Sequence, residues 1–201
     1  MNQTSRQQRH GEMKAAILQA ARAAILEHGP AQFSLRDVAR RSGYSPAGLY
    51  EYFSGKEDLV RAVADESLAQ LQASLSRAAG DLPPAQRLVE LGMAYVRFAH
   101  DNSQNFMLIF TQLPSRRATL QTPPVGASPY RLVLQAAQDG IDTGAFVARP
   151  GVGAEQIAYG LWALAHGMAM LQQTHLQRFQ ADFAAHDRRV LGQYVGGLGQ
   201  A

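Results

Sequence analysis

The sequence predicts an all-α protein, and three observations lead to this prediction. Apolar residues recur at spacings of three and four along most of the 201 residues, which is the spacing of one face of an α-helix. Alternating runs of β-branched residues, the pattern of strands, are scarce. Ser, Pro and Gly stand where the periodic segments begin and end, as in helix caps. With 46% hydrophobic residues, such a chain can bury a substantial core.

The composition excludes several classes of site. The absence of cysteine rules out a disulfide scaffold, a thiolate zinc site and a cysteine nucleophile. No apolar run approaches the ~20 residues that span a bilayer. The opening residues, MNQTSRQQRHGEMK, contain no apolar segment like that of a secretory signal. We therefore expect a cytoplasmic protein without a membrane partner.

The first helix is predicted over about residues 11–28, after a flexible basic arm at residues 1–10. Its apolar positions, among them Ile17 and Ile25, form one stripe. Gly29 stands where a left-handed cap is expected, and Pro30 follows as a stop.

Two short helices come next. Ser34 begins the first as an N-cap, with Asp37 three residues later as in a capping box, and Gly43 closes it. Ser45 and Pro46 begin the second, which we expect to end near Phe53. Two short helices joined by a glycine-containing turn form a helix-turn-helix unit, which needs neighbouring helices as its scaffold.

The remaining segments are also predicted to be helical. The stretch Ser54-Gly55-Lys56-Glu57 is a capping box that starts a long helix ending at Gly80. Later helices are expected at about residues 85–101, 128–139, 154–173 and 183–198, and Ser103 is expected to cap a short apolar piece, QNFMLIF, that is ended by Pro114. A Pro-, Ser- and Thr-rich loop separates two of them at residues 114–128.

The net charge of +3 is concentrated at one end of the chain. Up to Arg61 there are nine Lys and Arg against six Asp and Glu, whereas the rest of the chain carries ten of each. This asymmetry favours a polyanionic partner for the first third.

The stretch FSLRDVARRSGYSPAGLYEYFSGKEDLV resembles the DNA-binding signature of the TetR family of bacterial transcriptional regulators. The matching positions are Ala39, Gly43, Leu49-Tyr50, Phe53, Lys56-Glu57 and Leu59. Trp162, His166 and Gly167, in GLWALAHGMAML, resemble a Trp-His-Gly pattern in one subgroup of effector domains of that family, as does the NFMLIF segment.

The resemblance implies two domains: a DNA-binding domain at residues 1–61 and an effector-binding and dimerisation domain at residues 62–201. It implies a homodimeric repressor that a small molecule releases from a palindromic double-stranded DNA operator. The first domain would place the helix that starts at Ser45 in the major groove.

Ten residues are candidates for contact with DNA. We expect Leu49 and Phe53 to face the core, while Tyr50 offers its hydroxyl to a phosphate. The alternatives are that Tyr50 covers the core edge and that Arg36 is a solvated charge. The candidates are Ser34, Arg36, Ser45, Pro46, Ala47, Gly48, Tyr50, Glu51, Tyr52 and Lys56.

The recognition segment departs from the family pattern. Pro46, Ala47 and Gly48 occupy positions where many relatives carry Arg, Lys, Ser or Thr, and Tyr52 stands where histidine is frequent. Donors that read bases are therefore few, so specificity would rest on apolar contacts, Glu51, Tyr52 and DNA shape.

Aromatic and sulfur side chains after Gly80 suit a small-molecule cavity. The alternative for most of them is an ordinary core position. A buried His166 needs a partner, and a ligand could be that partner. The candidates are Met93, Tyr95, Phe106, Met107, Phe110, Tyr130, Trp162 and His166.

The last two long helices are expected to form the dimer interface, since the final one combines Leu191 and Val195 with Gly192, Gly196 and Gly197. The alternative is that this stripe packs only within its own chain. A helical enzyme and a DNA-binding protein without an effector are the other classes considered. Against an enzyme, the sequence shows no nucleophile motif, no phosphate loop and no metal-ligand pattern, so we expect no catalytic residues, metal or cofactor.

Overall fold

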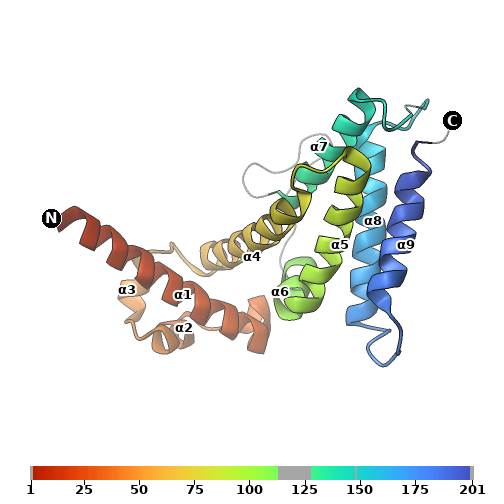
Figure 1. Ribbon diagram of the computed structural model, residues 1–201. Helices are drawn as coiled ribbons and strands as arrows, with labels where there is room; N and C mark the ends of the chain where they lie inside the picture. Colours follow the sequence, from red (N-terminus) through yellow and green to blue (C-terminus); the bar gives the residue numbers. More distant parts are fainter. Residues whose placement is uncertain (1, 113–127, 148, 200–201) are drawn as a thin grey trace. The chain divides into compact units, whose positions relative to one another are not determined.

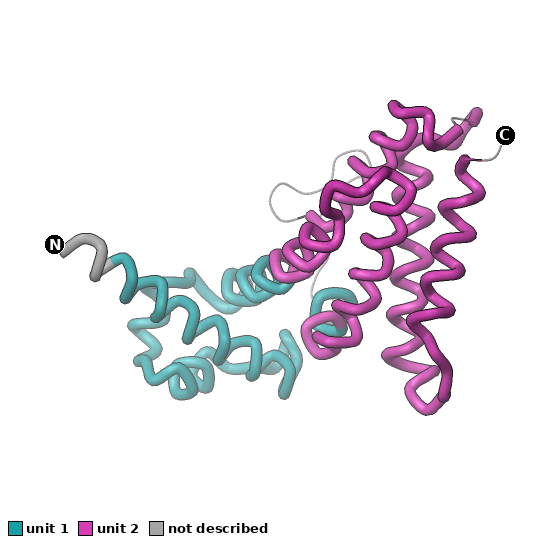
Figure 2. Tube along the Cα trace, in the orientation of Figure 1, with its two compact units in different colours: residues 1–67, 107–115 teal, residues 68–106, 116–201 magenta. Residues whose placement is uncertain are grey.

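The computed structural model describes residues 2–112, 128–147 and 149–199. The prediction of an all-α protein is confirmed, because in these ranges the regular elements are all helical and the only β pairing is an isolated bridge between Arg149 and Val152. The chain divides into two compact units (Figure 2). The N-terminal unit contains residues up to Ser67 and the segment that begins at Met107. The C-terminal unit contains Leu68–Phe106 and the helices from residue 129 onward.

The N-terminal unit begins with α1 (Asn2–Gln32), followed by α2 (Leu35–Ser42), α3 (Pro46–Tyr50) and the first half of α4 (Lys56–Ala79) (Figure 1). The predicted arm at residues 1–10 is wrong in one respect, because helix α1 already begins at Asn2 instead of Gly11. Gln8 donates to Glu12 one turn later, and the His10 ring lies 4.5 Å from the Tyr52 ring, so one contact within the helix and one with the turn after α3 support this part of α1.

The sequence predicts that a glycine ends each of the first two helices. This is confirmed for α2, whereas α1 is only interrupted at Gly29 and continues through Pro30 to Gln32. Gly29 has φ +78° within α1, and a final turn follows it. Gly43 caps α2 with φ +78° and donates its N–H to the carbonyls of Ala39 and Arg40. Both residues have positive φ, which suits glycine, but only Gly43, with ψ 19°, has the left-handed helical conformation, since ψ is 160° at Gly29.

The starts of α2 and α3 agree with the predicted caps, but the end of α3 differs. Ser34 Oγ accepts from the Arg36 N–H, and Ser45 Oγ accepts from the Gly48 N–H at 3.0 Å. Helix α3 ends at Tyr50 instead of near Phe53, because the Tyr52 and Phe53 N–H groups both turn back to the Leu49 carbonyl.

The predicted capping box before α4 is wrong in its acidic partner. The Asp58 carboxylate, not Glu57, accepts from the backbone N–H and the hydroxyl of Ser54. Asp37 likewise does not complete a box with Ser34, since its carboxylate binds Arg40 and Arg41. Asp58 therefore takes the place of Glu57 beside Ser54, and Asp37 is occupied by two arginines.

The N-terminal core collects side chains from every helix of this unit. Ile17 and Ile25 of α1, Val38 of α2, Leu49 of α3 and Leu59 of α4 are all fully buried in it. It also includes Leu108, which comes from the segment after the short helix α6 (Ser103–Met107). Leu108 begins a five-residue π-helical turn, Leu108–Gln112.

The C-terminal unit is a bundle of long helices. Helix α5 (Pro84–Asp101) packs on α7 (Pro129–Asp142), α8 (Ala154–Gln173) and α9 (Phe183–Gly196). Ion pairs join α5 to its neighbours: Arg87 to Asp139 at 2.6 Å and Arg188 to Glu90 at 2.5 Å. The Tyr194 hydroxyl of α9 donates to the Ile157 carbonyl of α8 at 2.9 Å. The predicted loop at residues 114–128 lies almost entirely outside the described residues.

Gly140 in α7 allows a buried ring to lie against the helix. A Cβ at Gly140 would lie 2.0 Å from Cε2 of Phe146, whose side chain is buried. Phe146 also donates its N–H to the Gly140 carbonyl at 2.9 Å, so the ring has little room to withdraw. In contrast, a Cβ at Gly167 in α8 would meet open space.

We expect Gly140→Ala to lower the free energy of unfolding by about 1–3 kcal/mol, because the new methyl group overpacks the Phe146 contact. Gly167→Ala should raise it by up to about 1 kcal/mol, since alanine is favoured over glycine inside a helix. Urea denaturation followed by circular dichroism measures both. Equal stabilisation by the two substitutions would contradict the packing described for Gly140.

Candidate functional site

The exposed surface of α2 and α3 contains most of the residues predicted to contact DNA. Ser45, Pro46 and Ala47 are exposed at the start of α3, and Gly48 is half-buried. Tyr50 is 57% exposed, whereas Leu49 beside it is fully buried. Phe53 is also buried, so the predicted division between core-facing Leu49 and Phe53 and outward-facing Tyr50 is confirmed. The outer surface of α3 therefore offers a tyrosine, a proline and small side chains, without a cation.

Tyr52 is placed differently from the other candidates. It follows α3 in the turn, is half-buried, and packs its ring against His10 of α1. Its hydroxyl lies 3.2 Å from Sδ of Met13. These contacts fix Tyr52 against α1, so its hydroxyl already has a partner within the N-terminal unit.

Lys56 also has partners within the N-terminal unit. Its ammonium donates to the Ala31 carbonyl at 2.6 Å and lies 4.6 Å from the centre of the Phe33 ring. These contacts tie the start of α4 to the turn after Gly29. The bond to Ala31 uses one of the three N–H donors of the ammonium, and α4 begins at this residue with its backbone N–H groups.

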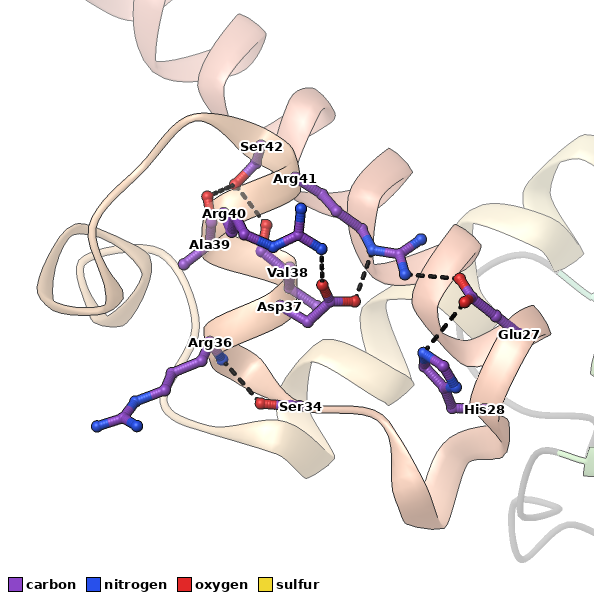
Figure 3. Close-up of polar contacts among 10 residues, drawn as sticks. All are labelled: Glu27, His28, Ser34, Arg36, Asp37, Val38, Ala39, Arg40, Arg41 and Ser42. Carbon is purple, nitrogen blue, oxygen red and sulfur yellow. Dashed lines mark hydrogen bonds and ion pairs between the residues drawn. The ribbon is translucent and has the colours of Figure 1, made fainter.

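The arginines of α2 form a charge network with two carboxylates (Figure 3). Asp37 binds the Arg40 guanidinium through one oxygen and Nε of Arg41 through the other, the latter at 2.5 Å. Arg41 also reaches back to Glu27 of α1 at 2.6 Å. The Arg40 hydrogen bond lowers the pKa of Asp37, and the Arg41 hydrogen bond lowers the pKa of Glu27, so both carboxylates are ionised near neutral pH.

Arg36 stands apart from this network. Its side chain extends away from Asp37 in Figure 3, and no described residue binds its guanidinium. The sequence identified Arg36 as a candidate, and Asp37 stands three and four residues before Arg40 and Arg41, a spacing that favours pairing on a helix. Only the second partner of Arg41, Glu27, depends on where α1 lies.

A second group of candidates gathers in the C-terminal unit. The Tyr95 hydroxyl of α5 and Nδ1 of His166 in α8 lie 2.9 Å apart. The Phe106 ring is 5.8 Å from the His166 ring and 5.6 Å from the Tyr95 ring. Trp162 lies 6.5 Å from His166 and 5.6 Å from Tyr130. We call these five residues the aromatic cluster.

The aromatic cluster gives His166 a partner from its own chain. The prediction left open whether a ligand would supply that partner, and in the structure the Tyr95 hydroxyl does so. Burial lowers the pKa of His166 and raises the pKa of Tyr95, so both side chains are uncharged at neutral pH. The cluster is therefore a neutral, aromatic environment with one hydroxyl–imidazole hydrogen bond.

Of the eight ligand candidates, three lie outside the aromatic cluster. Met93 is buried in α5. Met107 and Phe110 belong to the N-terminal unit, unlike Phe106. Tyr130 joins the cluster through Trp162, and its hydroxyl lies 3.4 Å from the Glu155 carbonyl.

The C-terminal unit has two surface grooves that the sequence did not predict. One lies between α7 and the start of α8 and includes Arg131, Gln135 and Glu155. The other is lined by the end of α4, α5 and α9, with Leu82, Val89 and Val195 among its residues. No periodicity or motif marks such grooves, because each is made by residues from separate helices.

Neither a membrane span nor a metal centre is found in the part of the chain that the structure describes. No helix there is both long and apolar enough to cross a membrane. The same residues contain no cluster of His, Asp and Glu side chains that would hold a metal ion.

The fold and this surface define a helix-turn-helix unit joined to a helical bundle. Residues 17–63 match the family described as "Bacterial regulatory proteins, tetR family". Residues 88–191 match "Tetracyclin repressor-like, C-terminal domain". The chain belongs to the TetR family of bacterial transcriptional regulators. Membership of the subgroup with the Trp-His-Gly pattern stays a prediction.

Named transcriptional regulators are similar to part of this chain. HTH-type transcriptional repressor Rv3405c of Mycobacterium tuberculosis is 46% identical over 54 residues, which are 27% of this chain and 29% of that protein. HTH-type transcriptional regulator TtgR of Pseudomonas putida is 36% identical over 67 residues, 33% of this chain and 31% of that protein. The chain thus matches about three tenths of the length of each of these two relatives.

Solved structures share the fold over nearly the whole chain. A protein of unknown function from Rhodococcus sp. RHA1 gives a TM-score of 0.74 at 23% identity, over 94% of this chain and 96% of that one. The transcriptional regulator FadR from Bacillus subtilis, solved in complex with stearoyl-CoA, gives 0.71 at 16% identity, over 93% and 99%. At these identities the likeness concerns the fold alone.

The lowered pKa of His166 predicts a pH dependence of stability. The folded state disfavours the charged imidazole. The contribution of His166 to the free energy of unfolding is therefore fully present above the ordinary pKa of 6.5, and it is lost as the pH falls below that value. We expect the free energy of unfolding to decrease less between about pH 7 and pH 5 in His166→Gln than in the wild type. Urea denaturation at several pH values measures this, with exposed His100→Gln as the control. An unchanged slope in His166→Gln would contradict the assignment.

Proposed function

We propose that this protein is a sequence-specific, DNA-binding repressor that acts as a homodimer and responds to a small molecule. The exposed α2–α3 surface, with Arg36 beside an N-terminal helix cap and Tyr50 directed outward, carries the proposal. Membership of the TetR family supports it, as does the repressor named among the relatives. Because these relatives match over only part of their length, the operator, partners and effector belong to the proposal.

The contacts with DNA divide by chemistry. Arg36, the exposed start of α2 at Ser34, and Tyr50 supply phosphate contacts, since a guanidinium, free N–H groups and a hydroxyl all donate to phosphate oxygens. Lys56 contributes through the N–H groups at the start of α4. Ser45, Pro46, Ala47 and Gly48 face the groove and bring the backbone close to the bases. Glu51 and Tyr52 lie at the edge of this surface.

Base recognition would be mainly apolar and indirect. Pro46 and Ala47 carry no hydrogen-bond donor on their side chains, and Ala47 suits contact with a thymine methyl group. Operator preference would then depend on the shape and deformability of the DNA in addition to such contacts.

The proposed dimer uses α8 and α9. Tyr159 and Leu171 of α8 and Val190 of α9 are large apolar side chains that remain exposed in the single chain. A two-fold axis across these helices would cover them and present two equivalent recognition helices, which requires a palindromic operator. A monomer mass in light scattering at micromolar concentration, both free and on DNA, would contradict the dimer.

The proposed effector site is the aromatic cluster. Its uncharged His166 and Tyr95, bordered by Trp162 and Phe106, suit an uncharged or weakly charged ligand with aromatic or aliphatic parts. A fold neighbour, the Bacillus subtilis FadR, was solved with a bound acyl-CoA, which supports a small molecule as effector in this fold. The ligand would shift the dimer toward a form that does not fit successive major grooves.

An electrophoretic mobility-shift titration tests the proposal. The probe is the DNA upstream of the gene for this protein, with and without candidate effectors. A complex of two chains per palindromic site that an effector dissociates is expected. Binding to that DNA no tighter than to a mixed-sequence duplex would contradict sequence-specific regulation, and an unchanged complex with every effector would favour a DNA-binding protein without one.

Arg36→Ala should weaken binding to all DNA sequences by about the same factor and reduce the slope of log K against log salt by about 0.9, the value for one phosphate contact. Arg77→Ala, an exposed arginine in the C-terminal half of α4, is the control with the same change in net charge. Mobility shifts between about 50 and 200 mM salt measure both slopes. Equal losses in the two variants would mean that Arg36 acts only through net charge.

The effector prediction uses Trp162, the only tryptophan, as a reporter. We expect uncharged aromatic ligands that release DNA to change its fluorescence, and operator DNA to weaken ligand binding by the same factor as the ligand weakens DNA binding. His166→Ala should reduce the ligand response and leave operator affinity nearly unchanged. Loss of operator binding with normal folding and a normal ligand response would instead assign His166 a role in supporting the N-terminal unit.

A further inference from the structure

The three arginines of α2 differ in their partners, and this difference has a consequence for DNA binding. Arg36 and Arg40 are four residues apart, so they lie on the same face of α2. Both are exposed, and the Arg40 side chain keeps 74% of its surface accessible. If Arg36 reaches a phosphate, Arg40 lies one helical turn away on the same surface. Arg40 nevertheless has a carboxylate partner, whereas no described residue binds the Arg36 guanidinium.

The charges of the network cancel. Glu27 and Asp37 supply two negative charges, and Arg40 and Arg41 supply two positive charges, with each carboxylate bound to at least one guanidinium. Arg41 is held from two sides, by Asp37 and by Glu27 of α1. Arg40 is held by Asp37 alone. Loss of the Asp37 charge would therefore free Arg40, while Arg41 would keep Glu27 as its partner.

We propose that Asp37 is a positioning residue that limits the affinity of the protein for DNA by keeping Arg40 paired on the phosphate-facing side of α2. This inference rests on the proposed function. With Asp37 in place, α2 presents one unpaired arginine to DNA instead of two. Because phosphate contacts carry no base information, this device lowers affinity for operator and non-operator DNA alike. It keeps the complex weak enough for an effector to release.

The test measures the salt dependence of binding to a mixed-sequence duplex and to operator DNA for the full-length protein. We expect Asp37→Asn to bind both duplexes several-fold more tightly at about 50 mM salt and to increase the magnitude of the slope of log K against log salt by about 0.9. The ratio of the two affinities should stay constant. A purely structural role for Asp37 would lower the affinity without steepening the slope.

Four further variants isolate the cause. Arg40→Gln alone should leave the slope unchanged, because Arg40 is already neutralised, and Asp37→Asn combined with Arg40→Gln should return the slope to the wild-type value. Glu27→Gln should not steepen it, since Asp37 still holds Arg40. Asp81→Asn, in the turn after α4 in the C-terminal unit, changes net charge equally and frees no arginine.

The outcomes separate this inference from the proposed function. Salt-independent binding or no binding of the wild-type protein to either duplex would contradict the proposed function itself. Normal wild-type binding with the same slope in Asp37→Asn, or the same increase in Asp81→Asn, would overturn the role of Asp37 alone. A changed ratio of operator to mixed-sequence affinity would also overturn it, because Asp37 or Arg40 would then take part in reading bases. If Asp37→Asn fails to fold, Asp37→Ser with the same double variant gives the same comparison.

Discussion

The burial of Leu49 and Phe53 is the constraint on which the rest of the N-terminal unit depends. Helix α3 has only five residues, far fewer than an isolated helix needs to persist in water. Its conformation is held by its Ser45 cap and by these two side chains in a core built mainly by α1 and α4. Because both anchors lie on one side, Pro46, Ala47 and Tyr50 are left on the other. The burial of Leu49 and Phe53 therefore determines which side chains of α3 are exposed.

Electrostatics organises the neighbouring helix in a different way. Helix α2 contains three arginines, but Asp37 and Glu27 bind the guanidinium groups of two of them. The contact between Arg41 and Glu27 also ties α2 to α1, so the same carboxylates that neutralise charge help to orient the helix. Exposed ion pairs of this kind contribute little to stability, typically about 0–1 kcal/mol each. Their larger effect here is on which cations are available.

Much of the fold could be predicted from sequence, since caps and periodicity are local. Ser34, Gly43 and Ser45 act where they stand, and the long amphipathic helices follow their apolar stripes. Partner choice could not be predicted in the same way. Lys56 binds the Ala31 carbonyl and Tyr95 provides the hydrogen bond of His166, because these partners depend on how separate segments meet. Asp58 replaces Glu57 as the partner of Ser54 within a single turn of chain, where either carboxylate stands close in sequence. The residue types of the candidate site were therefore predictable, whereas the partners that these side chains have within the chain were less so.

The position of Leu108 makes the N-terminal unit discontinuous in sequence. A fragment that stops within α4 would retain the helix-turn-helix segment and lose a fully buried side chain of its core, which the chain supplies only after α5 and α6. Phe106, two residues earlier, is a core residue of the other unit and belongs to the aromatic cluster. The N-terminal unit is thus assembled from two separate stretches of sequence. Exchange of such parts between relatives would have to carry this downstream segment along with the first four helices.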